Sequence, residues 1–164
     1  MATDAQGKWT EPRPVHADGW QIMGCPVNGP AVAANEQGEI VTAWYTAADG
    51  RPRIQLARYD SLAGAFADPV LLDDASPLGR VDVQVGADGT AYVLGLAAGE
   101  SAEFGRLVLW EVSRAGEIRE RTVARMATAR SSGFPRLALL DDELWIAYTD
   151  TGAERVRLCS LPMR

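Results

Sequence analysis

With 164 residues, of which 47% are hydrophobic, the chain is long and apolar enough to bury one core, and this composition argues against a disordered protein. Its formal net charge of -6 argues against non-specific binding to nucleic acid or to an anionic membrane, because either would require a face dominated by lysine and arginine. We therefore expect one domain with no nucleic-acid partner and no membrane partner.

The chain begins with a segment, residues 1–15, that ends in the proline-rich sequence WTEPRPV from Trp9 to Val15. Prolines are tolerated in an edge strand because the missing N–H then faces solvent. We predict an outermost strand here, and the alternative is an unstructured leader. The segment has no basic stretch followed by an apolar one, and no run in the chain reaches the length of a membrane span. We therefore expect a cytoplasmic protein unless an export signal lies upstream of this sequence.

The stretch from Cys25 to Tyr59 has the pattern of three short antiparallel strands. Apolar or alternating runs cover residues 29–33, 40–45 and 53–59, and a Gln-Gly pair and an Asp-Gly pair separate them as turns. This pattern predicts a meander of adjacent strands.

The pattern recurs twice further along, with a repeat of about 50 residues, which is in the range of four-stranded propeller blades. A fourth strand is expected in the first unit at 66–72 and in the second at 119–123, but none follows in the third. We therefore predict an all-β fold of three antiparallel blades that make half of a β-propeller: blade 1 at 20–75, blade 2 at 76–125 and blade 3 at 130–164. The remaining strands are expected at residues 77–83, 90–96, 107–112, 133–140, 143–148 and 155–161.

The beginning of the chain carries a degraded family motif. Residues 2–9, ATDAQGKW, match the Asp-box pattern S-x-D-x-G-x-x-W at Asp4 and Trp9, while Ala2 replaces the serine and Gly7 is displaced. The run GWQIMGCPVNGPA leads into the first repeat unit, and GRVDV and GFPRLA stand where the second and third units begin. With these sequences the chain resembles the C-terminal half of bacterial sialidase-like (BNR repeat) propeller proteins. That family is six-bladed, so the resemblance implies that the chain is one half-propeller.

Three blades cannot close a ring, since known propellers have roughly four to eight. Two copies of this single domain, 1–164, would supply six, with the strand at 1–15 of each copy completing blade 3 of the other in a twofold arrangement. We therefore expect a homodimer. The alternative is that the chain is half of a longer protein and pairs with a second, different half.

The resemblance also indicates a ligand site. In sialidases an arginine triad binds the substrate carboxylate, because the planar donors of arginine suit that group. Arg80 and Arg136 stand where inner strands begin, and Asp82 follows Arg80 on the same strand face. This implies a channel mouth that accepts an anionic or carbohydrate small molecule, formed by Arg80, Arg136 and Asp82 with Asn28 and Trp20 beside them. The commoner alternative is that these arginines join neighbouring blades through ion pairs or backbone hydrogen bonds.

The other chemically distinctive side chains are assigned no ligand. His16 is the only histidine and no cysteine cluster accompanies it, so we expect no metal site and no cofactor. Cys25 and Cys159 stand far apart in sequence and are expected to be buried thiols, with a disulfide left open. Tryptophans within strands are expected to pack between blades, namely Trp44, Trp110 and Trp145.

The sequence offers no tyrosine and glutamate that pair as a sialidase nucleophile, so we expect no catalysis by this chain alone. The predicted function is that of a non-catalytic binding or assembly module that self-associates into a six-bladed ring. The alternative is half of a sialidase-type glycoside hydrolase that needs its second half for activity.

Overall fold

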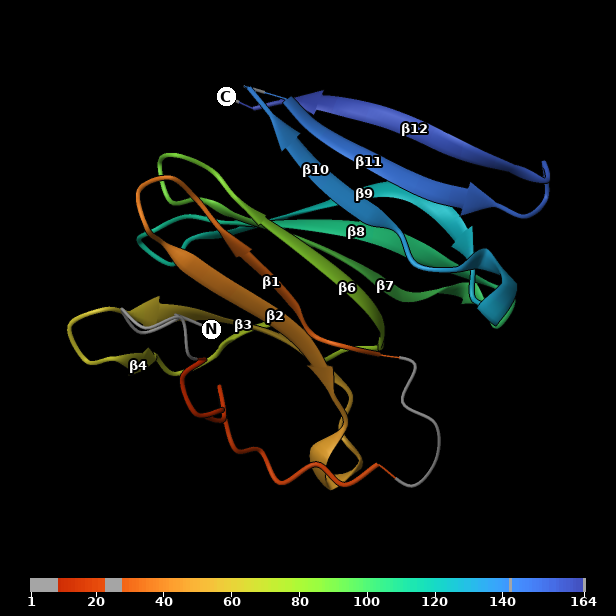
Figure 1. The fold of residues 1–164 in the computed structure, drawn as a ribbon. Coiled ribbons are helices and arrows are strands. Elements are labelled where there is room, and N and C mark those ends of the chain that lie inside the picture. Colours follow the sequence, from red (N-terminus) through yellow and green to blue (C-terminus); the bar gives the residue numbers. More distant parts are fainter. Residues whose placement is uncertain (1–8, 23–27, 142, 164) are drawn as a thin grey trace.

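The computed structural model describes residues 9–22, 28–141 and 143–163, and it contains three antiparallel β-sheets arranged side by side as blades (Figure 1). The first strands of the sheets, β1 (Ala31–Ala34), β6 (Pro77–Val85) and β10 (Arg136–Leu140), lie next to one another, and later strands of each sheet run outward. The expected all-β architecture of consecutive blades is therefore present.

Blade 1 is the predicted meander with a divided outer strand. The strands pair in the order β1-β2-β3, and both short outer pieces, β4 and β5, pair with β3. The backbone N–H of Ala67, directly after β4, still donates to the Arg58 carbonyl of β3. The break that follows contains Pro69, which has no N–H to donate to a neighbouring strand. The elements are β1 (Ala31–Ala34), β2 (Ile40–Thr46), the 3-10 turn η1 (Ala48–Gly50), β3 (Arg53–Asp60), β4 (Ala65–Phe66) and β5 (Val70–Asp73).

Blade 2 is a complete four-stranded sheet in the order β6-β7-β8-β9. Its two central strands, Ala91–Ser101 and Phe104–Val112, contain apolar runs because both faces are covered by neighbouring blades. Val93 and Leu94, adjacent in β7 and on opposite faces, are both fully buried. The elements are β6 (Pro77–Val85), β7 (Ala91–Ser101), β8 (Phe104–Val112) and β9 (Ile118–Ala127).

Blade 3 has three strands within the described residues, in the order β10-β11-β12, as predicted. They are β10 (Arg136–Leu140), β11 (Glu143–Asp150) and β12 (Arg155–Pro162), and the 3-10 turn η2 (Arg130–Ser132) connects them to blade 2. Strand β12 pairs with β11 on one side, and no strand of the described chain pairs with its other edge. The helical segments are single turns, and no described helix is long and apolar enough to cross a membrane.

The core consists of two apolar layers, one between each pair of neighbouring blades. Trp110 lies in the layer between blades 1 and 2, where it is almost fully buried against the backbone of Gly95, and so confirms the prediction of inter-blade packing. This layer also includes Val41, Ala43, Ile54, Leu56, Val83, Val93 and Val108. The layer between blades 2 and 3 includes Tyr92, Leu94, Leu96, Leu107, Leu109, Met126, Leu137, Leu144 and Ile146.

Residues 9–22 run along blade 1 rather than along blade 3 (Figure 1). The ring of His16 lies 6.4 Å from that of Trp44, and the Trp20 ring meets Tyr45 edge-on at 5.5 Å. Apart from a bridge residue at Trp9 the described segment forms no strand. Most of the predicted Asp-box lies outside the described residues, and the exchange of this segment with a second copy stays a prediction.

Candidate functional site

The start of β6 is held by the side chain of Asn28. Its Oδ1 accepts a hydrogen bond from the backbone N–H of Arg80 at 3.0 Å, and its Nδ2 donates to the Leu78 carbonyl at 3.3 Å. A Cβ at Gly79 would come within about 2.5 Å of the Asn28 amide, so only glycine fits there. Gly79 and Arg80 both have positive φ, 84° and 56°, and the register of β6 shifts twice around them. These bulges turn the Arg80 side chain away from the regular alternation of the strand.

Arg80 is enclosed by the segment that links blade 2 to blade 3. Its guanidinium donates to Ser132 Oγ at 2.6 Å and to four backbone carbonyls, those of Ala127 at 3.5 Å, Thr128 at 2.5 Å, Ala129 at 3.0 Å and Gly133 at 3.2 Å. Burial of this side chain lowers the pKa of the guanidinium from its usual value. Arg80 therefore serves to join two blades, which is the alternative that the sequence left open.

Asp82 joins the same two blades by a second route. Its Oδ2 accepts a hydrogen bond from the backbone N–H of Leu137 at 2.8 Å, and its Oδ1 accepts one from Val83 at 3.0 Å. Asp82 also lies 3.8 Å from Nη1 of Arg136, whose side chain is 70% exposed. This pair contributes little to stability, because the Arg136 side chain is in solvent, which screens the interaction. Arg136 is thus the predicted mouth residue that still presents its guanidinium to solvent.

The structure brings four of the five predicted site residues together. Asn28 contacts Arg80, and Asp82 links that strand to Arg136. Trp20 instead packs on Tyr45 in blade 1, following a turn in which Asp18 accepts from the Trp20 backbone N–H.

Asp18 itself is held ionised by this turn. Partial burial alone would raise its pKa, but hydrogen bonds from Thr46 and from the Trp20 backbone outweigh that effect and lower it.

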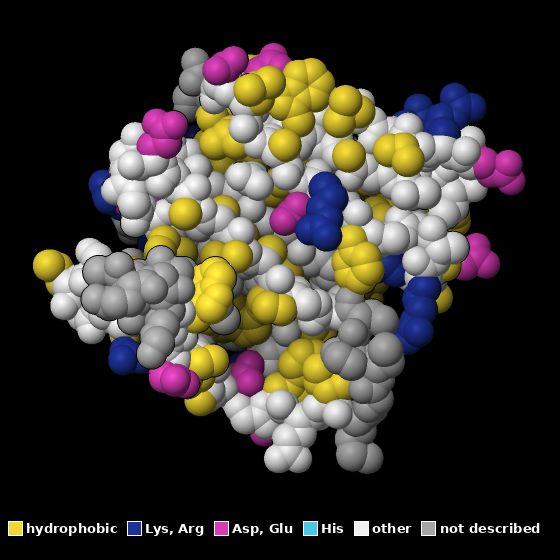
Figure 2. Space-filling view, viewed as in Figure 1, with side chains coloured by type: hydrophobic (Ala, Val, Ile, Leu, Met, Phe, Trp, Pro, Cys, Tyr) yellow, Lys and Arg dark blue, Asp and Glu magenta, His cyan; other side chains and the backbone are white. Residues whose placement is uncertain are grey.

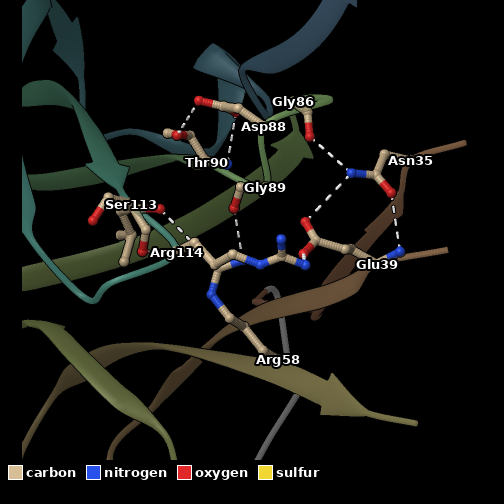
Figure 3. A network of polar contacts seen from close by, with 10 residues as sticks. Asn35, Glu39, Arg58, Gly86, Asp88, Gly89, Thr90, Ser113 and Arg114 are labelled. Carbon is tan, nitrogen blue, oxygen red and sulfur yellow. Dashed lines mark hydrogen bonds and ion pairs between the residues drawn. The ribbon is translucent and has the colours of Figure 1, made fainter. Parts of the chain in front are cut away.

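A second polar cluster joins blades 1 and 2 and was missed from the sequence. Arg58 donates to the carbonyls of Gly89 at 2.8 Å, Val112 at 2.9 Å and Ser113 at 3.3 Å (Figure 3). Its pKa is lowered by burial, an effect that the nearby carboxylate of Glu39 partly offsets. The sequence could have indicated this cluster, because Arg58 lies on the same strand face as Ile54 and Leu56. A charged side chain on a buried apolar face requires hydrogen-bond partners there.

Two more contacts complete this cluster. Glu39 forms an ion pair with Arg114, and Asn35 donates to the Gly86 carbonyl at 2.8 Å while accepting from the Glu39 backbone (Figure 3). The turns of the two blades are therefore fixed against each other by hydrogen bonds rather than by apolar contact alone.

Two concave regions of comparable size lie on the described surface. One, of about 640 Å³, lies where turns of all three blades meet and includes Asn35, Gln84, Asp88, Tyr92, Leu139 and Met163 in its lining. The other, of about 650 Å³, lies on blade 2 and includes Ser101, Phe104, Arg106, Thr122 and Arg125. None of the predicted mouth residues lines either region.

The remaining expectations concern metals, thiols and tryptophans. Within residues 9–22, 28–141 and 143–163, no three histidine, cysteine or acidic side chains cluster as metal ligands. Cys159 is exposed rather than buried, because β12 is an edge strand, and Cys25 lies outside the described residues. Trp44 and Trp145 are only half-buried, since each lies in a blade that has a neighbour on one side only.

Comparison with known proteins supports the fold but assigns no family. No protein-family profile and no curated protein matches the chain. Among solved structures it is similar to the α-L-arabinanase of Penicillium chrysogenum, determined in complex with arabinobiose, with a TM-score of 0.61 and 14% sequence identity. The match covers 87% of this chain and 47% of the arabinanase, so the chain spans about half the length of that protein. The fold is therefore part of a propeller of the kind found in a glycosidase, and the likeness is not specific to sialidase-like proteins.

Proposed function

We propose that this chain is a non-catalytic half-propeller that assembles with a second copy of itself into a six-bladed ring. The observation that carries the proposal is the bare apolar face of blade 3. The inner face of this blade packs on blade 2, with Leu137, Leu144 and Ile146 buried. No blade of the described chain lies against the opposite face.

The bare face has the composition of a blade interface. Leu140, Val156 and Leu158 are 61%, 72% and 64% exposed, although strand residues of this kind are normally buried. Strand pairing places Leu158 beside Ala147 and aligns Ala138 with Trp145, so the apolar side chains form one surface across all three strands. Figure 2 shows hydrophobic side chains along the upper edge of the molecule, where blade 3 lies in Figure 1. A contiguous exposed surface of this type is characteristic of an interface.

Buried polar atoms without partners among the described residues occur on the outward faces of blades 1 and 3, and also between blades 1 and 2 at Nε1 of Trp110. Nε1 of Trp145, on the bare face of blade 3, is a buried donor with no acceptor among the described residues. Oε1 of Gln55, in blade 1, is a buried acceptor with no donor there. Gln55 lies opposite Trp44 in the strand pairing, so it belongs to the face of blade 1 that points away from blade 2. A ring of two copies would bring these two faces together.

Closure of the six-bladed ring would also give a partner to the edge of β12 that is unpaired in the described chain. The segment at 1–15, which includes Trp9, would pair with β12 of the other copy, as the sequence predicts. This exchange would remove an unpaired strand edge.

The twofold axis of the proposed ring runs along its central channel, so Arg136 of each copy is an exposed cation at the same channel mouth. The Arg80 guanidinium already donates to backbone carbonyls, so Arg80 gives no support to a sialidase-type arginine triad. An anionic small molecule bound through Arg136, next to Asp82, remains our proposal for the ligand. The alternative, half of a glycoside hydrolase, is supported only by the likeness to the arabinanase.

The test is the solution mass, measured by light scattering, of the intact chain, of a version lacking residues 1–15, and of Leu158→Arg. We expect a dimer for the intact chain and monomers for the two variants. Leu62→Arg is the matched control, because Leu62 is fully exposed in a turn of blade 1, and it should stay dimeric. A monomeric intact chain, or a Leu158→Arg dimer, would contradict self-assembly. Hydrolysis of an arabino-oligosaccharide or a sialoside by the purified chain would contradict the non-catalytic assignment.

A further inference from the structure

We propose that the groove on blade 2 binds a small molecule through an oxyanion, a carboxylate or a phosphate, held between Arg106 and Arg125. This groove is separate from the predicted channel mouth. It is formed by the ends of β7 and β8 and by the facing part of β9.

The two arginines occupy an unusual position in the sheet. Arg106 in β8 and Arg125 in β9 are direct cross-strand partners, so their side chains leave the same face next to each other. Like charges placed directly opposite one another destabilise a sheet unless something compensates them. The chain as a whole is acidic, with a formal net charge of -6, so this pair is a local departure from its surroundings.

The existing contacts leave donors of both arginines for a ligand. Arg106 contacts Glu120 Oε1 at 3.2 Å and Thr122 Oγ1 at 3.3 Å, and both contacts use Nη1 alone. The guanidinium carbon of Arg125 lies 3.7 Å from the centre of the Phe104 ring, and the described residues include no acidic partner for it.

Stacking orients the Arg125 guanidinium before any ligand arrives. The ring lies over the guanidinium carbon, so it does not cover the N–H groups at the edge of the planar group. Such an edge binds the paired oxygens of a carboxylate or phosphate bidentately, and its preorganisation reduces the entropy lost on binding.

The size and lining of the groove suit a small molecule. Its volume of about 650 Å³ lies in the range of ligand pockets. Hydroxyl groups of Ser101 and Thr122 can contact polar parts of a ligand, and Phe104, Ala98 and Ala124 supply apolar surface. Glu100 is the acidic residue of the lining and Glu120 pairs with Arg106, so Arg125 is the cation of the groove without an acidic partner among the described residues, which favours an anion of low charge.

The experiment is a titration of the isotope-labelled intact chain with sodium acetate, sodium benzoate and inorganic phosphate, followed by amide NMR shifts at constant ionic strength. We expect saturable shifts at Phe104, Arg106 and Arg125 with at least one probe. Benzoate binding more tightly than acetate would identify a carboxylate ligand with an apolar body, and preference for phosphate would identify a phosphate ligand. Absence of saturable shifts with every probe, or equal shifts with sodium chloride, would overturn the proposal.

Variants show whether the arginines carry the binding. Arg106→Gln and Arg125→Gln should each weaken it by about tenfold or more, the loss of one good charge-assisted contact. Phe104→Leu keeps both charges and removes the stacking partner, so it should weaken binding less than Arg125→Gln. Arg119→Gln is the control, because this residue lies on the same strand, outside the groove lining, and its loss changes the net charge equally. Equal affinity of Arg125→Gln and Arg119→Gln would contradict the proposed site.

Discussion

The carboxylate of Asp82 in β6 accepts a hydrogen bond from the backbone N–H of Leu137 in β10 at 2.8 Å. This contact joins the innermost strands of blades 2 and 3 directly. A residue that the sequence placed at a ligand-binding mouth thus also holds two blades together, and it does so from a nearly buried position.

Substitution of Asp82 should therefore lower stability. Asp82→Ala leaves the buried N–H of Leu137 without an acceptor, which we expect to reduce the free energy of unfolding by about 1 to 3 kcal/mol. Urea unfolding followed by tryptophan fluorescence measures the change. Asp74→Ala, at an exposed position, is the control and should change it by less than about 0.5 kcal/mol. Equal effects of the two substitutions would contradict a joining role for Asp82.

Loss of the Arg80 guanidinium should release the segment between β9 and β10. Arg80→Met removes the donor that four carbonyls share, so we expect a loss of about 2 to 4 kcal/mol. Amide hydrogen exchange should become faster at Ser132 and Gly133, whose N–H groups form the turn η2. Arg130→Met is the control because Arg130 is exposed in the same turn. Unchanged exchange at both amides in Arg80→Met would show that the turn holds without this arginine.

Gly95 should tolerate no side chain. A Cβ there would lie 2.9 Å from the Trp110 ring and 3.0 Å from Cδ1 of Ile54, inside the layer between blades 1 and 2. We expect Gly95→Ala to destabilise the protein by about 1 to 3 kcal/mol through overpacking. Gly29→Ala is the control, since no atom lies within 4 Å of the added methyl group. Thermal unfolding compares the two, and a melting temperature of Gly95→Ala at or above that of the control would argue against close packing at this point.

Acid should destabilise the protein in part through Asp88. The backbone N–H and then the hydroxyl of Thr90 donate to this carboxylate and lower its pKa below the usual value of 3.8. A group whose pKa is lower in the folded state stabilises the protein above its unfolded pKa, and this contribution is lost as the pH falls through the folded pKa. Asp88→Asn should therefore reduce the difference in stability between pH 7 and about pH 3. Denaturant midpoints measured over this range, with Asp74→Asn as control, test the effect; an undiminished difference in Asp88→Asn would contradict it.

Much of the strand pattern was predictable because alternation and turn residues act locally. The stretch expected at 53–59 is β3, Arg53–Asp60, and that expected at 155–161 is β12, Arg155–Pro162. The outer strand expected at 66–72 is divided into β4 and β5, since the chain around Pro69 leaves the ladder.

The roles of the charged residues were less predictable. Arg58 and Arg80 are paired mainly with backbone carbonyls of other segments, and a carbonyl carries no residue-specific signal in the sequence. The groove containing Arg106 and Arg125 was likewise hidden, because the two residues become neighbours only through the register of β8 and β9.

The sequence alone determined the all-β class and the order of the blades, because period-two alternation and turn chemistry depend on residues close together. The tertiary structure decided what each charged side chain does. At Arg80 the positive φ and the neighbouring bulges redirect the side chain toward carbonyls some 50 residues away along the chain, and such a direction follows from the packing of whole blades rather than from local pattern.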